Sequence, residues 1–151
     1  MFEGSYDNTV DEKGRVAIPA KYREILSVSG EDRVMVTWHF VKPSPCLDVW
    51  PPAAWQAKQA KLEQATSSFS QARATFNAVY IGQMRACQLD RQGRILIPQA
   101  LRQRAQLGDA VTFVGAGSKF QIFSEANYQR VLEEYAESVM TDPNLFNELG
   151  I

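Results

Sequence analysis

The sequence has few of the residues from which reactive centres are built. Its 151 residues include only two cysteines and one histidine. Cys46 and Cys87 stand alone, outside any CxxC pair and away from the histidine, so neither a zinc site nor a disulfide framework is predicted. We interpret both cysteines as small apolar residues of the core.

Long apolar runs are also missing. No stretch approaches the ~18 apolar residues of a membrane span, and Glu3 and Asp7 interrupt the segment where a signal peptide would need an apolar run. With 45% hydrophobic and 22% charged residues, the composition is typical of a globular protein. We therefore expect a cytoplasmic protein with one compact domain, or with two small units that share a core.

Signatures of catalysis are equally scarce. The sequence contains no Gly-x-Ser-x-Gly elbow, phosphate loop or HExxH pair. His39 lies in the strand-like run VTWHFV, and we interpret it as a structural residue. We therefore predict that the protein is not an enzyme, and we expect no metal, no cofactor, no small-molecule substrate and no membrane partner.

The sequence also has no excess of positive charge. Its net charge is -1, whereas nucleic-acid-binding domains are usually basic. The charges are nevertheless unevenly distributed. Between Arg85 and Arg104 there are five arginines and one acid, whereas from Glu125 onward six acidic residues accompany Arg130 alone. We expect one basic face and one acidic face.

What the sequence does have is an internal repeat. VDEKGRVAIPAKYR at 10–23 returns as LDRQGRILIPQALR at 89–102, an offset of 79 residues. A β-rich run follows each copy, DRVMVTW or DAVTFVG, and then a second one, CLDVW or KFQIF. The identical pairs are Asp11/Asp90, Gly14/Gly93, Arg15/Arg94, Ile18/Ile97, Pro19/Pro98 and Arg23/Arg102. We interpret the chain as two copies of one structural unit.

Each copy predicts a strand, a tight turn, a strand, a short helix and two more strands. Gly14 and Gly93 can adopt the positive φ that such turns require, and the preceding Asp11 and Asp90 can accept backbone amides of the turn. Proline at the first helical position then starts each helix, and Gly30 and Gly108 are plausible ends.

Two further helical regions are predicted. The segment between the copies has Trp55, Leu62, Phe69 and Phe76 seven residues apart, and we expect helices there with a break near 66–68. A last helix is expected from about 125 to 140, where Asp142-Pro143 ends it.

Arg15 and Arg94, directly after the turn glycines, are not needed for folding. A guanidinium at a hairpin tip can bind phosphate or the acceptor edge of guanine, and Lys13 and Arg91 add charge beside it. Alternatively, each arginine pairs with the aspartate of its own turn, an arrangement that still permits DNA binding. For Arg23, a solvated helix face or a salt bridge is as good an interpretation as a phosphate contact.

The repeated pattern D-x-x-G-R-x-x-I-P resembles the SpoVT-AbrB swapped-hairpin motif. Two copies in one chain, the start MFEGSY, the segment PCLDVWP before a Trp-containing helix, and QALRQRAQL after the second copy are similar to the MraZ family over essentially the full chain. Single-copy relatives of this motif dimerise to form their DNA-binding unit. The resemblance therefore implies an α+β fold in which two β-rich repeats form one barrel-like core with pseudo-two-fold symmetry.

On this basis the expected organisation is repeat 1 at 5–52, connecting helices at 53–80, repeat 2 at 81–124, and a C-terminal helix and tail at 125–151. The resemblance also implies a nucleoid-associated regulator. Such a regulator binds repeated sites in the promoter of the division and cell wall gene cluster as a ring-shaped homo-oligomer, usually to repress its own operon.

The family's D-x-x-x-R signature falls on Asp11 and Arg15 and again on Asp90 and Arg94. Because the second copy has Gln92 where the first has Lys13, we expect the first copy to be the principal reader of bases. The DNA-binding residues expected are Lys13, Arg15, Arg91, Arg94 and Arg23. The alternatives are an antitoxin-like DNA-binding protein, an enzyme on a related barrel and a protein-interaction adaptor.

Overall fold

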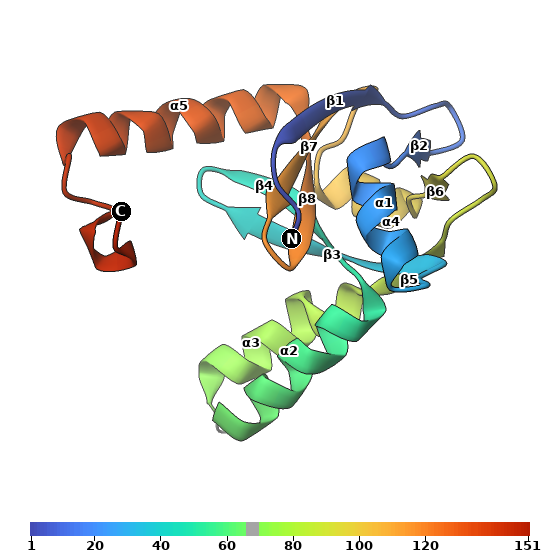
Figure 1. Cartoon of the computed structure of the whole chain (residues 1–151), viewed down its shortest axis with the longest axis horizontal. Coiled ribbons are helices and arrows are strands. Elements are labelled where there is room, and N and C mark those ends of the chain that lie inside the picture. Colours follow the sequence, from blue (N-terminus) through green and yellow to red (C-terminus); the bar gives the residue numbers. More distant parts are fainter. Residues whose placement is uncertain (66–69) are drawn as a thin grey trace.

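The computed structural model describes residues 1–65 and 70–151 (Figure 1). Its strands are β1 (Ser5–Thr9), β2 (Arg15–Ala17), β3 (Arg33–Val41), β4 (Ser44–Trp50), β5 (Arg85–Gln88), β6 (Arg94–Leu96), β7 (Ala110–Ala116) and β8 (Lys119–Ser124). Its helices are α1 (Ala20–Val28), α2 (Pro52–Ala65), α3 (Gln71–Val79), α4 (Gln99–Arg104) and α5 (Glu125–Thr141), with short 3-10 turns at Ile81–Gln83 and Asn147–Leu149. The fold is therefore mixed α+β.

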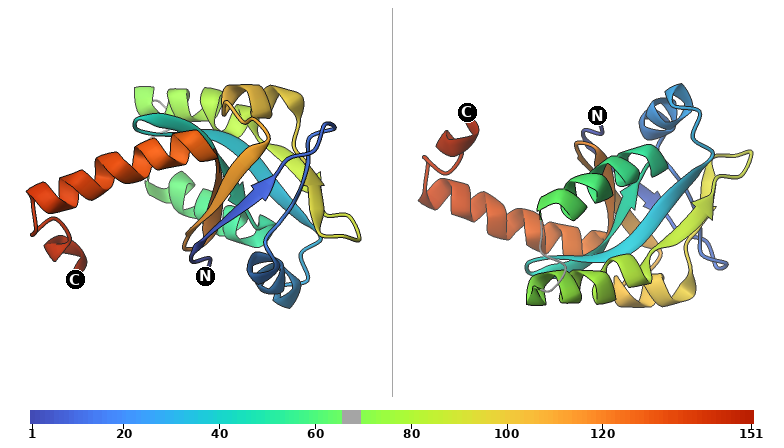
Figure 2. Two further views of the ribbon diagram at one scale, coloured as in Figure 1. Left: turned by 90° about the horizontal axis from the view of Figure 1, so that it is seen from above. Right: turned by 90° about the horizontal axis from the view of Figure 1, so that it is seen from below.

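Six strands form one antiparallel sheet in the order β1-β7-β8-β4-β3-β5, and β2 and β6 pair separately as a two-stranded ribbon. This ribbon and helices α1 and α4 occupy one end of the molecule (Figure 2). At the other end α5 projects away from the sheet, while α2 and α3 extend from its lower side in Figure 1.

The sheet interleaves the two halves of the chain. Near the N-terminus, β1 pairs with β7, so that Tyr6 faces Phe113. In the opposite exchange β5 pairs with β3, so that Val34 faces Cys87. Because each half supplies a strand to the other, the halves cannot separate without breaking hydrogen-bonded ladders.

One main core lies between the sheet, the ribbon and the two short helices. Val16 and Ile95 face each other across the ribbon and are each only 1% exposed. They pack with Tyr22 of α1 and with Phe113 and Phe120 of the sheet, all fully buried. Cys46 and Cys87 are buried as expected, although Cys46 belongs to a smaller cluster under α5.

The described residues do not form the barrel-like core that the sequence led us to expect. They form an open sheet and a separate two-stranded ribbon. Among the described residues, the outer strands β1 and β5 lie at opposite edges and do not pair with each other. The ribbon strands are three residues long, and Pro19 and Pro98 follow shortly after them. Since proline has no amide to donate, these strands cannot extend into ladders that would close a barrel.

The helices begin one residue later than expected, because Pro19 and Pro98 are the N-cap residues of α1 and α4 and not their first helical residues. Gly30 follows α1 with a φ of 69°, as a helix-ending glycine does. In the second copy Gln106 takes the positive φ, at 58°, and Gly108 does not. The helix expected from 125 to 140 runs to Thr141. The break expected near 66–68, and Phe69, lie outside the described residues.

His39 lies on strand β3, as the strand-like sequence around it indicated. It is beyond the part of β3 that pairs with β5. No helix in the described part of the chain is long and apolar enough to cross a membrane.

Candidate nucleic-acid interface

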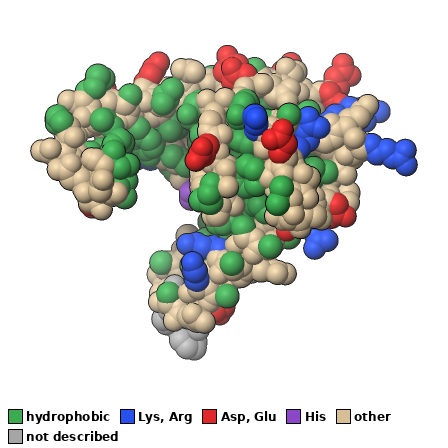
Figure 3. Space-filling view, viewed as in Figure 1, with side chains coloured by type: hydrophobic (Ala, Val, Ile, Leu, Met, Phe, Trp, Pro, Cys, Tyr) green, Lys and Arg blue, Asp and Glu red, His purple; other side chains and the backbone are tan. Residues whose placement is uncertain are grey.

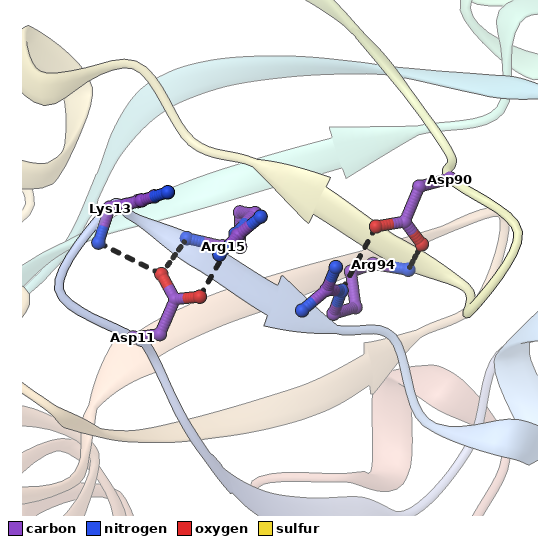
Figure 4. A network of polar contacts seen from close by, with 5 residues as sticks. All are labelled: Asp11, Lys13, Arg15, Asp90 and Arg94. Carbon is purple, nitrogen blue, oxygen red and sulfur yellow. Dashed lines mark hydrogen bonds and ion pairs between the residues drawn. The ribbon is translucent and has the colours of Figure 1, made fainter.

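The candidate interface is built on two turns that enter the ribbon, the first tip (residues 11–15) and the second tip (residues 90–94). Arg15 pairs with Leu96 across the ribbon, and Ala17 pairs with Arg94. Side chains alternate between the two faces of a strand, so the burial of Val16 in the core turns its neighbours outward. Both arginines therefore lie on the outer face of the ribbon (Figure 4).

The first tip is organised by one carboxylate. Oδ1 of Asp11 accepts the backbone amides of Lys13 and Arg15, each at 2.9 Å. Its Oδ2 accepts the side-chain Nε of Arg15 at 2.9 Å. A single aspartate thus closes the turn and holds the arginine that follows it.

The second tip repeats this geometry. Oδ1 of Asp90 accepts the amides of Gln92 and Arg94 at 2.8 and 2.9 Å, and Oδ2 accepts Nε of Arg94 at 2.9 Å. The intramolecular pairing considered from the sequence is therefore present at both tips, as ion pairs between the aspartate and the arginine of each turn.

Each arginine binds its aspartate through Nε and not through the terminal nitrogens of its guanidinium. Among the described residues, no hydrogen bond involves a terminal Nη of Arg15 or Arg94. The two side chains remain 36% and 32% exposed. Because a guanidinium is planar, holding Nε fixes the direction of its remaining donors, which can meet two acceptors at once.

The hydrogen bonds of the turns also lower the pKa values of the two aspartates. The pKa of Asp11 lies below its usual value, first because the backbone amide of Arg15 donates to it and then because the side chain of Arg15 does. The pKa of Asp90 is lowered in the same way by Arg94. Both carboxylates are therefore charged at neutral pH and hold their arginines there.

Each tip is hydrogen-bonded to the residue that follows the opposite ribbon strand. The amide of Ile18 donates to the carbonyl of Gly93, and the amide of Ile97 donates to the carbonyl of Gly14, each at 2.9 Å. This reciprocal pair extends the short ladder between β2 and β6. It makes the spacing between Arg15 and Arg94 a property of the fold and not of two independent loops.

A second pair of arginines packs beneath the tips. Nε of Arg23 donates to the carbonyl of Ile18 at 3.0 Å, and its side chain lies against Gly93, where an added Cβ would meet Cδ at 2.3 Å. Arg102 donates equivalently to Ile97 and lies against Gly14. Arg23 is thus part of the support of the opposite tip, and the shared spacing of glycine and arginine in the two copies was the only sequence signal of this packing.

The remaining charged residues are less constrained. Lys13 and Arg91 are exposed at the turns and make no ion pair within the described residues. Lysine and arginine side chains project at the end of the molecule that carries the tips (Figure 3). Leu96, which the sequence did not single out, is 55% exposed opposite Arg15 and adds an apolar group to the outer face.

These features define an α+β protein with two aspartate-held arginine tips joined in one ribbon. Residues 1–78 and 81–144 match the model of a family described as "MraZ protein, putative antitoxin-like". The chain belongs to the MraZ family.

Several curated relatives, each named "Transcriptional regulator MraZ", cover nearly the whole chain. The Nitrosococcus oceani protein is 34% identical over 100% of this chain and 98% of its own length. The Dechloromonas aromatica protein is 37% identical over 99% of each chain, and that of Saccharophagus degradans is 41% identical over 83% of each.

Among solved structures, the solution structure of PHS018 from Pyrococcus horikoshii matches with a TM-score of 0.37 and 14% identity. The match covers 81% of this chain and 88% of the other. A TM-score this low supports no inference about fold or function.

We predict that Gly93→Ala destabilises the protein more than Gly30→Ala does. Both glycines have a positive φ, 74° and 69°, which costs an alanine about 1 kcal/mol. Only Gly93 also lies against an arginine, since nothing lies within 4 Å of a Cβ at Gly30. Urea unfolding should give Gly93→Ala the larger loss, by ~1 kcal/mol or more. Equal losses would show that the packing of Arg23 contributes nothing.

We predict that carboxyl NMR titration places the midpoints of Asp11 and Asp90 below 3.8, the ordinary value. A lowered folded pKa stabilises the native state above the unfolded pKa, and this stability is lost as pH falls through the folded pKa. In Arg15→Leu the backbone amide remains, so the midpoint of Asp11 should rise only part of the way, while Asp90 serves as the unchanged control. A midpoint of Asp11 at or above 3.8 in the unmodified protein would contradict the geometry.

Proposed function

We propose that this protein is a transcriptional regulator that binds double-stranded DNA in a sequence-specific manner. The observation that carries the proposal is the outer face of the ribbon, where Arg15 and Arg94 are each held through Nε by an aspartate and no hydrogen bond among the described residues uses their terminal nitrogens. The names of the relatives support the same function.

In the proposed mechanism the ribbon enters the major groove, which is wide enough to admit a two-stranded β-ribbon. Arg15 donates two hydrogen bonds to a guanine, with Lys13 beside it, and Leu96 offers an apolar contact to a thymine methyl group. Arg91 and Arg94 contact phosphates and hold the register. Since Nε of Arg23 is already used, any phosphate contact by Arg23 would involve only its terminal nitrogens.

The two halves of the chain act as a fused dimer in this proposal. Equivalent hydrogen bonds at Asp11 and Asp90, and between the tips, support pseudo-two-fold symmetry of the repeats at 5–52 and 81–124. The helices at 53–80 and the segment 125–151 are then additions to this unit. A pair of arginines held in one ribbon in this way suits insertion as a unit into a single groove.

Affinity in this proposal comes from assembly, because a net charge of -1 provides little general attraction to DNA. A ring-shaped homo-oligomer would engage tandem promoter repeats through several tips at once. Support comes from α5, which exposes Leu132, Tyr135 and Met140 by 47%, 45% and 75%, an apolar face suited to another copy of the chain. Apolar side chains are visible along the underside of α5 in Figure 3.

In this reading the regulator is cytoplasmic and nucleoid-associated, and it represses its own operon in the division and cell wall gene cluster. The apolar face of α5 also fits an alternative, a protein-interaction adaptor or an antitoxin-like protein that binds a protein partner there. A pull-down that recovers such a partner after nuclease treatment, together with equal weak binding to promoter and scrambled DNA, would favour this alternative.

We predict that Arg15→Ala loses specific DNA binding while it remains folded. Fluorescence anisotropy with the upstream promoter DNA and a scrambled control, at two salt concentrations, should show salt-sensitive binding that prefers the promoter. The lost guanine contact should weaken promoter binding by about 5- to 150-fold, the equivalent of ~1–3 kcal/mol. Arg130→Ala, on the far-lying α5, is the matched control and should bind normally. Normal promoter binding by folded Arg15→Ala would refute the role of the tip.

We predict that sedimentation detects a closed oligomer and that Tyr135→Glu reduces it to smaller species. A charge placed within an apolar contact between copies is costly to bury, so the contact should be lost. Gln129→Glu, which adds the same charge at another exposed position of α5, should leave the assembly intact. Monomers alone in the unmodified protein would remove the argument that affinity comes from assembly.

A further inference from the structure

A cavity of about 150 Å³ lies between the sheet and the helices that connect the two halves of the chain. None of the tip residues lines it. Part of its wall comes from the segment CLDVW, which the sequence analysis singled out and the proposed DNA interface leaves unexplained. An engineered apolar cavity of ~150 Å³ is large enough to bind benzene, so this one can hold a single aromatic ring.

The floor of the cavity is a buried polar network. Asp48, which is 1% exposed, accepts hydrogen bonds from the hydroxyl of Tyr80 at 2.5 Å, from Nζ of Lys119 at 3.0 Å and from Nε2 of Gln121 at 2.9 Å. Nε1 of Trp50 donates to the same hydroxyl of Tyr80 at 2.7 Å. Burial raises the pKa of Tyr80, so its hydroxyl remains a donor. Asp48 already has three partners and does not need a ligand.

The walls of the cavity are mainly aromatic. The rings of Trp50 and Trp55 lie 5.5 Å apart, and that of Trp55 lies 5.8 Å from Tyr80. Phe76 of α3 stacks on Tyr80 at 4.7 Å, and Leu62 of α2 completes the apolar lining. At these distances the rings contact one another and form one continuous aromatic wall, against which a planar ring can lie.

The rim of the cavity is cationic. Lys58 on α2 is exposed, lines the cavity and makes no ion pair within the described residues. Nζ of Lys119 lies 5.3 Å from the centre of the Trp50 ring. With Asp48 balanced by Lys119, the charge left at the opening is the positive charge of Lys58. This rim repels a cationic ligand and attracts an anionic one.

From these observations we infer that the cavity binds a small planar aromatic anion, with the ring against the wall formed by Trp55, Phe76 and Tyr80 and the negative group toward Lys58. This site shares no residue with the tips. It gives the connecting helices a binding role of their own.

The probe that tests this inference is benzoate. Benzamide and benzylamine, which have the same ring but are neutral and cationic, are the control ligands. In ¹H–¹⁵N spectra of the full chain, benzoate should shift the indole signals of Trp50 and Trp55 saturably, with a dissociation constant on the order of 1 mM. The indole of Trp38, which donates to the carbonyl of Arg104, should stay in place. Benzamide should bind more weakly than benzoate, and benzylamine should not bind.

Lys58→Gln tests the rim without disturbing the core. It should weaken benzoate binding roughly two- to fivefold, as expected for loss of an exposed charge, and leave benzamide binding unchanged. Lys61→Gln, on the same helix and exposed but outside the cavity, is the matched control and should have no effect. The inference is overturned if benzoate does not bind saturably, if benzylamine binds as tightly, if the two variants behave alike, or if only the Trp38 signal moves.

Discussion

Two backbone hydrogen bonds, from Ile18 to Gly93 and from Ile97 to Gly14, tie each turn to the end of the opposite ribbon strand, and the rest of the candidate interface depends on them. Glycine is required at both turns, because an arginine side chain packs against the same backbone. Through them the burial of Val16 and Ile95 in the core sets the position of both turns. The direction of each outward arginine therefore follows from the packing beneath the ribbon.

The aspartate at each tip contributes more to geometry than to stability. Exposed ion pairs are generally worth ~1 kcal/mol or less, because water and mobile side chains offset the attraction. Asp11 nevertheless closes the turn through two backbone amides and orients Arg15 through Nε. An arginine already held in one direction loses less conformational freedom when it binds an acceptor. A weak surface contact can in this way improve recognition while adding little to folding.

The cavity lies against the six-stranded sheet, and the ribbon is a separate pair of strands. β3 joins them, since its first residues pair with β5, which leads to the second tip, and Thr37 in its middle donates to the carbonyl of Tyr80 at the cavity floor. The segment that includes helices α2 and α3 supplies more than half of the residues that line the cavity, and the tips supply none of them.

The sequence by itself determined the local features: the repeat, the turns at Gly14 and Gly93, the helix starts after the prolines, and the family. Each of these follows from residues close together in the chain, whose conformational preferences act within a few residues. Only the tertiary structure decided that β1 pairs with β7, that Arg23 supports the opposite tip, and that Asp48, Trp55 and Tyr80 meet in one cavity. Such partners are distant in sequence, and packing of the whole core selects among many pairings that the local pattern allows equally.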